Sequence, residues 1–342
     1  MNRIPTLDGW RGIAILIVLA DHLQLAANGH YATPWTAIGQ HGVTIFFVLS
    51  GFLITSKLTE NPIDLRSFYT KRFFRLMPAA WLFLAALAFV GWKMNTQAIS
   101  SSALSGCLFF YRNFQSLPND GLNAHFWSLA LEEQFYLAWP LILILAGVRR
   151  SRWIAGAGAV ACAAYRYANW AAYDGSWSSR HSEVRADALL VGCLAALLLR
   201  DPRFRTLAAR WSKVLALPAA AVVCFCMASF AFLPPLYESV CIAILICASS
   251  LNPDSLPSRM LQFRPLAKLG MVSYSVYLWQ ELFMGFQGWE LVGGVCLGLP
   301  LMAIVSYEYI ELPSTKLGSK LAKLLNSSSQ SDRFPSAAVV NP

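Results

Sequence analysis

An arginine and a histidine bracket the first apolar segment of the chain: Arg11 and His22, in LDGWRGIAILIVLADH. In a helix, eleven residues make about three turns, so both side chains share one face, about 16 Å apart along the axis. Ionisable groups inside a membrane helix are costly and usually face a cavity in which they act. Histidine titrates near neutral pH, which suits His22 to general-base chemistry. The alternative is that Arg11 ends the helix at the headgroups and His22 is a satisfied buried polar residue.

Two adjacent carboxylates, Glu132 and Glu133, stand in another apolar stretch, FWSLALEEQFYLAWPLI. Neighbouring helical residues point about 100° apart, so the two cannot face one cavity equally, and Glu132 shares its stripe with Ser128 and Tyr136. Carboxylates at this depth need a proton or a cationic partner. We therefore expect one of them to orient His22, as the third member of a catalytic triad does. The alternative is a pair that snorkels to the membrane surface.

A basic cluster follows the second apolar segment, where SFYTKRFFRLMP contains Lys71, Arg72 and Arg75. Arg72 and Arg75 are three residues apart and lie on one helix face. Such a fork binds phosphate bidentately, and the sequence therefore indicates an anion site. The alternative is that these cations only anchor the loop on the cytoplasmic side.

A further charged group, Arg166, Arg185 and Asp187, stands near the outer ends of the fifth and sixth apolar segments. These residues could bind a polar acceptor, or they could tie two helices together. The sequence leaves both interpretations open.

The elements that position these residues are membrane helices. The chain has 342 residues, of which 56% are hydrophobic and 13% charged, whereas soluble domains have about 25% charged residues. We predict an all-α, polytopic membrane bundle of about ten transmembrane helices. The apolar segments are approximately 12–28, 40–57, 77–93, 125–147, 153–171, 184–199, 213–233, 237–251, 268–286 and 289–308.

Basic residues fall in alternate gaps, after the second, fourth, sixth, eighth and tenth segments. The positive-inside rule then predicts that these gaps and both termini are cytoplasmic. The net charge of +9 is explained by these loops, and we expect no nucleic-acid partner. The eight cysteines lie in apolar stretches without metal-binding or CxxC spacing, so neither a metal site nor a disulfide framework is expected. We also expect no cleaved signal peptide.

Two segments depart from the regular pattern of spans. Residues 100–112 are apolar but too short to cross a bilayer, and we predict a re-entrant or surface helix on the outer side. We assign residues 1–312 to the membrane domain and 313–342 to a cytoplasmic tail. The tail is polar from about residue 325 and predicted to be disordered there.

Taken together, the stretches around these residues resemble acyltransferase family three, the bacterial inner-membrane O-acylases of cell-surface sugars. They cover residues 6 to about 286 and include GVTIFFVLSGFLIT, RADALLVGCLAAL and LGMVSYSVYLWQELF as well as those quoted above. The resemblance implies catalytic roles for Arg11 and His22, with Glu132 or Glu133 assisting. It also implies donor binding by Lys71, Arg72 and Arg75. One departure is Gln280, where many relatives have a histidine.

The resemblance further implies a reaction. Acetyl-CoA, or another acyl-CoA, would dock from the cytoplasm, and His22 would act as the base or as an acyl carrier. The acceptor would be a hydroxyl of a surface polysaccharide or glycolipid, contacted by residues that include Tyr136, Trp127, Arg166, Arg185 and Asp187. Some relatives carry a fused extracytoplasmic esterase-like domain. We expect no such domain in this protein, and we therefore expect the membrane domain to acylate the acceptor itself or with a separate partner.

Two other classes of membrane protein compete with this interpretation. Ten spans with buried charges also describe a transporter of an anionic or sugar-linked substrate, but no inverted repeat or paired broken spans are evident. A non-catalytic scaffold would leave His22 and Glu132 without a purpose.

Overall fold

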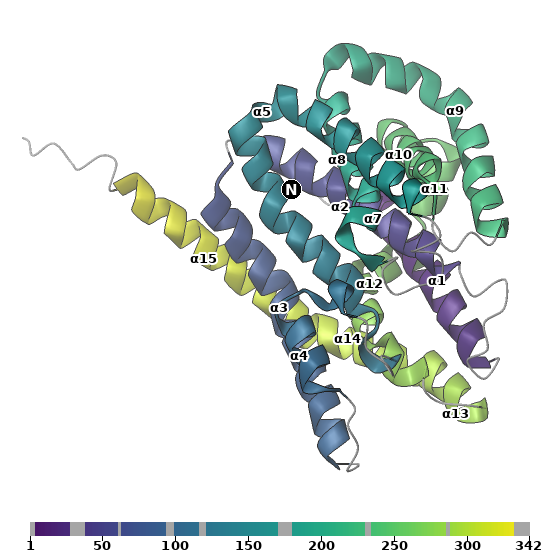
Figure 1. Ribbon diagram of the computed structural model, residues 1–342, viewed down its shortest axis with the longest axis vertical. Coiled ribbons are helices and arrows are strands. Elements are labelled where there is room, and N and C mark those ends of the chain that lie inside the picture. The colour runs from purple at the N-terminus through teal and green to yellow at the C-terminus, as the bar shows by residue number, and fades with distance from the viewer. Residues whose placement is uncertain are drawn as a thin grey trace, which may run out of the picture.

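The computed structural model describes residues 4–27, 38–60, 63–93, 99–115, 121–169, 180–229, 234–284 and 288–331. Within these ranges every regular element is a helix and no strand occurs, which confirms the predicted all-α class. The helices pack into one bundle (Figure 1). Five helical stretches are long and apolar enough to cross a membrane: Gly39–Glu60, Leu65–Lys93, Gly121–Ala168, Pro202–Ala228 and Glu290–Leu325.

The helices that surround the polar residues come from both halves of the chain. They are α1 (Pro5–Ala27), α2 (Gly39–Glu60), α3 (Leu65–Lys93), α5 (Phe126–Ala168), α8 (Asp187–Leu199) and α12 (Arg264–Met284). α5 is kinked at Gly147, where φ is 73°, a conformation that glycine adopts without strain. This kink lies at the boundary that the sequence predicts between the fourth and fifth spans.

Small residues fix how closely these helices approach. A Cβ atom on Gly51 of α2 would collide with the carbonyl oxygen of Leu189 in α8, and one on Gly192 of α8 would collide with that of Val48. Gly51 therefore has a packing role, because the absence of a side chain lets α2 approach α8 closely. Likewise, Gly270 of α12 leaves no room for a Cβ atom beside the carbonyl oxygen of Asp8 in α1.

The short segment at 100–112 forms an eight-residue helix, α4 (Ser101–Leu108), followed by η2 (Arg112–Phe114). Eight residues extend about 12 Å, too short to cross a bilayer, as the sequence predicts. Arg112 is fully buried, and it donates a hydrogen bond to Asn123 Oδ1 in η3 (Gly121–Asn123) at 2.9 Å. Burial lowers the pKa of its guanidinium group. These contacts hold the segment against the start of α5.

The remaining helices complete the bundle. They are α7 (Ser182–Arg185), α9 (Pro202–Ala228), α10 (Leu236–Leu251), α11 (Leu256–Leu261), α13 (Gly288–Gly293), η5 (Gly294–Gly298), α14 (Leu299–Ser306), η6 (Tyr307–Glu311) and α15 (Leu312–Ser331). The last five follow one another without a gap. α15 lies along α3 (Figure 1). The proposed boundary at residue 312 thus falls inside a helical segment, and residues after 331 lie outside the described ranges.

The close crossing of α2 and α8 predicts that Gly192→Ala destabilises the protein. The added methyl group meets the backbone of Val48, which cannot yield as a side chain can. We expect a loss of about 1–3 kcal/mol, measured by thermal unfolding of the purified protein in detergent. Gly156→Ala is the matched control, because its Cβ atom meets only Leu194 Cδ2 at 3.7 Å. Equal melting temperatures for the two variants would contradict this packing.

Candidate active site

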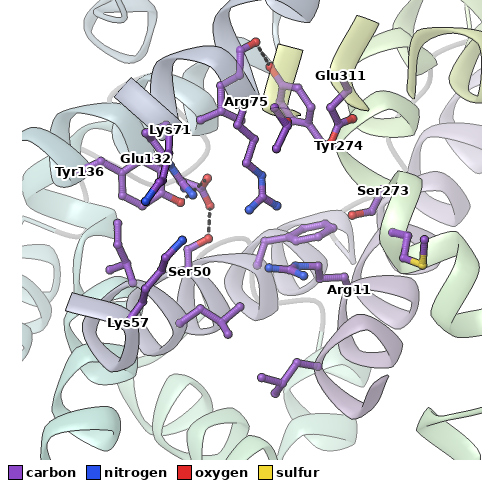
Figure 2. Close-up of a pocket in the computed structure, with 18 of the residues that line it drawn as sticks. Arg11, Ser50, Lys57, Lys71, Arg75, Glu132, Tyr136, Ser273, Tyr274 and Glu311 are labelled. Carbon is purple, nitrogen blue, oxygen red and sulfur yellow. Dashed lines mark hydrogen bonds between the residues drawn. The ribbon is translucent and has the colours of Figure 1, made fainter. Parts of the chain in front are cut away.

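A cavity of about 520 Å³ lies between α1, α2, α3, α5, α12 and the C-terminal helices. Figure 2 shows how side chains from these elements reach into the same space. Its charged lining comes from sequence regions far apart in the chain. The cationic residues are Arg11, Lys57, Lys71, Arg72 and Arg75, and the acidic residues are Asp8, Asp64, Glu132 and Glu311. We call this space the central cavity.

The three cations of the predicted anion site all line the central cavity. Arg72 lies over the ring of Tyr136, with its guanidinium carbon 3.5 Å from the ring centroid. Such cation–π contact fixes the direction of the guanidinium group while leaving its N–H donors usable. Arg11 lines the cavity from α1, across from these cations, and donates to Asp8 Oδ1 at 2.8 Å. The cavity therefore has the charge and the donor groups to hold phosphate.

Glu132 and Glu133 have different surroundings. Glu132 lines the central cavity and accepts hydrogen bonds from Ser50 Oγ at 2.9 Å and Tyr136 Oη at 3.0 Å. The stripe that the sequence predicts for Glu132 and Tyr136 is thus present. Glu133 is not among the described residues that line the cavity. Of the two carboxylates, Glu132 is the one that faces the cations.

His22 lies three turns further along α1, next to a carboxylate from α12. Its Nδ1 is 3.7 Å from Glu281 Oε1, and both side chains are only partly exposed. The carboxylate beside the histidine is therefore Glu281, whereas Glu132 is bonded to Ser50 and Tyr136. At one end of the α1–α12 contact, Gly270 packs closely against the backbone of Asp8. That packing sets the register that brings the two residues together.

A pair of hydroxyl groups joins α5 and α12 in the lining of the cavity. Ser128 Oγ of α5 and Tyr277 Oη of α12 lie 2.6 Å apart, and both residues line the central cavity. Tyr277 and Glu281 are four residues apart on α12 and so lie on one face in successive turns. We call these two residues the Ser128–Tyr277 pair.

The arrangement combines a cationic cavity with a histidine–carboxylate pair. The first suits a ligand that carries phosphate groups, and the second suits proton abstraction from a hydroxyl group. Within the described ranges no group of three or more histidine, cysteine or acidic residues could hold a metal ion.

Comparison with known proteins agrees with this chemistry. A family described as an acyltransferase domain matches residues 4–307, which is most of the chain. The chain belongs to this acyltransferase family. The family match supports the resemblance found from the motifs.

Several known proteins are similar to this chain. The peptidoglycan O-acetyltransferase OatA of Listeria monocytogenes is 27% identical over 92% of this chain and 56% of its own length. YrhL of Bacillus subtilis is 31% identical over 91% of this chain and 54% of its own length. The O-acetyltransferase OatA of Staphylococcus aureus is 28% identical over 93% of this chain and 58% of its own length. This chain therefore spans a little more than half the length of these relatives. No solved structure matches it.

Of the predicted acceptor residues, only Tyr136 is among the described residues that line the central cavity. Arg166 instead forms a buried two-pronged ion pair with Asp187, with N–O distances of 2.9 and 3.2 Å. Arg185 lies 5.7 Å from the ring centroid of Trp127 and donates to Thr44 Oγ1 at 3.3 Å. These contacts join α5, α7, α8 and α2. They match the alternative in which this charged group ties helices together.

The sequence motifs did not identify three residues in or near the site. Glu281 stands inside a predicted span, and a charge at that depth is itself a signal of function. Arg180 carries no such signal, yet it interacts electrostatically with Tyr277 and Glu281, and burial lowers the pKa of its guanidinium group to about 10. Glu311 reaches the cavity wall from η6 and accepts a hydrogen bond from Ser275 Oγ at 3.0 Å.

The buried Arg166–Asp187 pair predicts a large effect on stability. Asp187→Ala leaves Arg166 buried without its carboxylate, so we expect unfolding to become easier by about 3–5 kcal/mol. The double variant Arg166→Met with Asp187→Leu removes both charges and should recover most of that loss. Thermal unfolding in detergent measures both. If Asp187→Ala melts like the wild type, the pair does not tie the helices.

Proposed function

We propose that this protein is a membrane O-acetyltransferase that moves an acetyl group from acetyl-CoA to a sugar hydroxyl of a cell-surface glycan. One observation carries the proposal: the cationic central cavity and the His22–Glu281 pair lie along the same helix, α1. Their separation along the axis is about 16 Å. The cations of the cavity would bind the phosphate groups at one end of the donor, and His22 would lie near its reactive end.

The donor end of the site is the central cavity. Arg72, Arg75 and Lys71 would hold the phosphate groups of acetyl-CoA, and Arg11 adds a fourth cation on the opposite wall. Glu132 limits the excess positive charge and, through Ser50 and Tyr136, keeps the wall of α5 fixed. The pantetheine arm would then run toward Ser128 and Tyr277. Another acyl-CoA would satisfy the same contacts.

The acceptor end of the site is His22. The imidazole would remove the proton from the incoming hydroxyl, or would carry the acetyl group itself as an acyl-imidazole. Glu281 would orient the ring and stabilise its cationic form, the role of the carboxylate in a triad. This replaces the partnership with Glu132 or Glu133 that the sequence suggested. The acceptor is a surface polysaccharide or glycolipid, and the relatives' names point to peptidoglycan.

The distribution of basic residues among the loops suggests which side of the membrane each substrate would come from. About ten spans, with both termini and the basic gaps in the cytoplasm, would open the central cavity to cytoplasmic acetyl-CoA. His22 would then lie nearer the outer surface of a bacterial inner membrane. The acetyl group would cross the bilayer inside the protein while the two substrates stay on opposite sides.

A first prediction concerns His22. His22→Ala should lower acetyl transfer by at least about 100-fold, because positioned general-base catalysis contributes that much or more. The assay uses protein in vesicles, acetyl-CoA and muramidase-released peptidoglycan fragments, with products counted by mass spectrometry. His181→Ala is the control, since His181 lies outside the central cavity lining. Substantial transfer by the His22 variant would overturn the assignment, and donor-independent substrate flux without chemistry would favour a transporter.

A second prediction concerns the donor cations. Arg75→Gln should raise the KM for acetyl-CoA by about tenfold, the loss expected for one charge-assisted phosphate contact, with little change in kcat. Arg205→Gln is the matched control, because Arg205 is an exposed basic residue outside the cavity lining. Steady-state kinetics over a range of acetyl-CoA concentrations measure both. Unchanged donor kinetics in Arg75→Gln would mean that these cations serve only as topological anchors.

A further inference from the structure

The last described helix, α15, carries all of its charged side chains in one stripe. Its ionisable residues are Lys316, Lys320 and Lys323, and the helix contains no acidic residue. Spacings of four and three residues place these lysines on one face of the helix. All three are exposed, and none forms an ion pair with a described residue. We call these three residues the lysine stripe.

The rest of the α15 surface divides into two further faces. Gly318 and Ala322 are buried, and a Cβ atom on Gly318 would lie 2.5 Å from Phe74 Cβ in α3. Leu317 and Leu324 are instead 49% and 64% exposed. These two leucines share a face about 90° around the helix from the lysine stripe. An exposed apolar face beside a lysine-rich face is typical of a helix at a membrane surface.

The length of the C-terminal helical stretch indicates where this surface lies. Glu290–Leu325 comprises 36 residues, which extend about 54 Å along a helix axis. A bilayer with its headgroups is about 40–45 Å thick. Lys316 and Lys323 lie about 39 and 50 Å from Glu290 along the axis. When Glu290 lies in one headgroup layer, the lysine stripe therefore reaches the other layer, which the basic loops predict to be cytoplasmic.

The lysine stripe is separate from the cations of the donor site. None of its members is among the described residues that line the central cavity, although Thr315 and Ser319 of the same helix are. Figure 1 shows α15 running along α3 and past the rest of the bundle. Cationic side chains at this position face the membrane surface, where each lysine increases the affinity for anionic lipid about fivefold.

We propose that the lysine stripe binds the phosphate groups of anionic lipids, with Leu317 and Leu324 in the adjoining acyl region. Charge complementarity selects this ligand, because three unpaired ammonium groups attract a lipid with a net negative charge. A zwitterionic lipid brings its own cation and gains little from them. α15 is then a membrane-surface anchor. The inference is independent of the proposed function, because it uses no residue of the reaction.

The triple variant Lys316→Gln, Lys320→Gln and Lys323→Gln tests the proposal, because it removes the charges and keeps a polar surface. The full chain, purified in neutral detergent, is titrated with phosphatidylglycerol, and thermal unfolding reports the binding. We expect the half-stabilising concentration of phosphatidylglycerol to be about 100-fold higher for the variant than for the wild type. Phosphatidylcholine should stabilise both proteins equally. Without added lipid both should melt at the same temperature, since the three lysines are exposed.

The matched control is the triple variant Arg203→Gln, Arg205→Gln and Arg210→Gln, which removes three exposed cations from α9. It should keep the wild-type response to phosphatidylglycerol. An unchanged response in the lysine variant, or an equal loss in the α9 control, would overturn the proposal. So would a higher KM for acetyl-CoA in the lysine variant, because it would assign the stripe to the donor; we expect that KM to be unchanged.

Discussion

The free-energy cost of burying charged side chains among apolar helices is the main constraint on this structure. Five cationic side chains line one cavity among helices whose outer surfaces are apolar, and a cation in such a place needs a nearby carboxylate, an aromatic face or a polar ligand. Arg11 pairs with the carboxylate of Asp8, and Arg72 lies over the ring of Tyr136. We propose that the charge left over binds an anion, and the phosphate groups of an acyl-CoA donor would fit that requirement.

The same cost explains why the polar groups follow helix–helix contacts. Glycine residues let α1 approach α12, and α2 approach α8, closely enough for side chains to meet across each contact. His22 meets Glu281 across the first contact, and Arg166 meets Asp187 where α5 packs on α8. The side chains of His22 and Glu281 are 23% and 14% exposed, whereas those of Arg166 and Asp187 are 6% and 3% exposed. We propose that the more exposed pair takes part in the reaction and that the buried pair holds helices together.

The sequence predicted the parts that depend on local spacing. Helical periodicity was enough to put Arg72 and Arg75 on one face and Glu132 on the stripe of Tyr136, and all four residues line the cavity. It could not identify the partner of His22, because that depends on the register between α1 and α12, which tertiary packing sets. Nor could it decide whether Arg166 and Asp187 bind a ligand, since burial and pairing appear only when α5 meets α8.

We propose that donor and acceptor meet the protein from opposite sides of the membrane. The most direct test places acetyl-CoA, which does not cross bilayers, on one side of vesicles with oriented protein and soluble peptidoglycan fragments on the other. The account predicts acetylated fragments when acetyl-CoA is on the face that carries Lys57 and Lys71 and the fragments are opposite. Product formed only when both substrates share one side would contradict it.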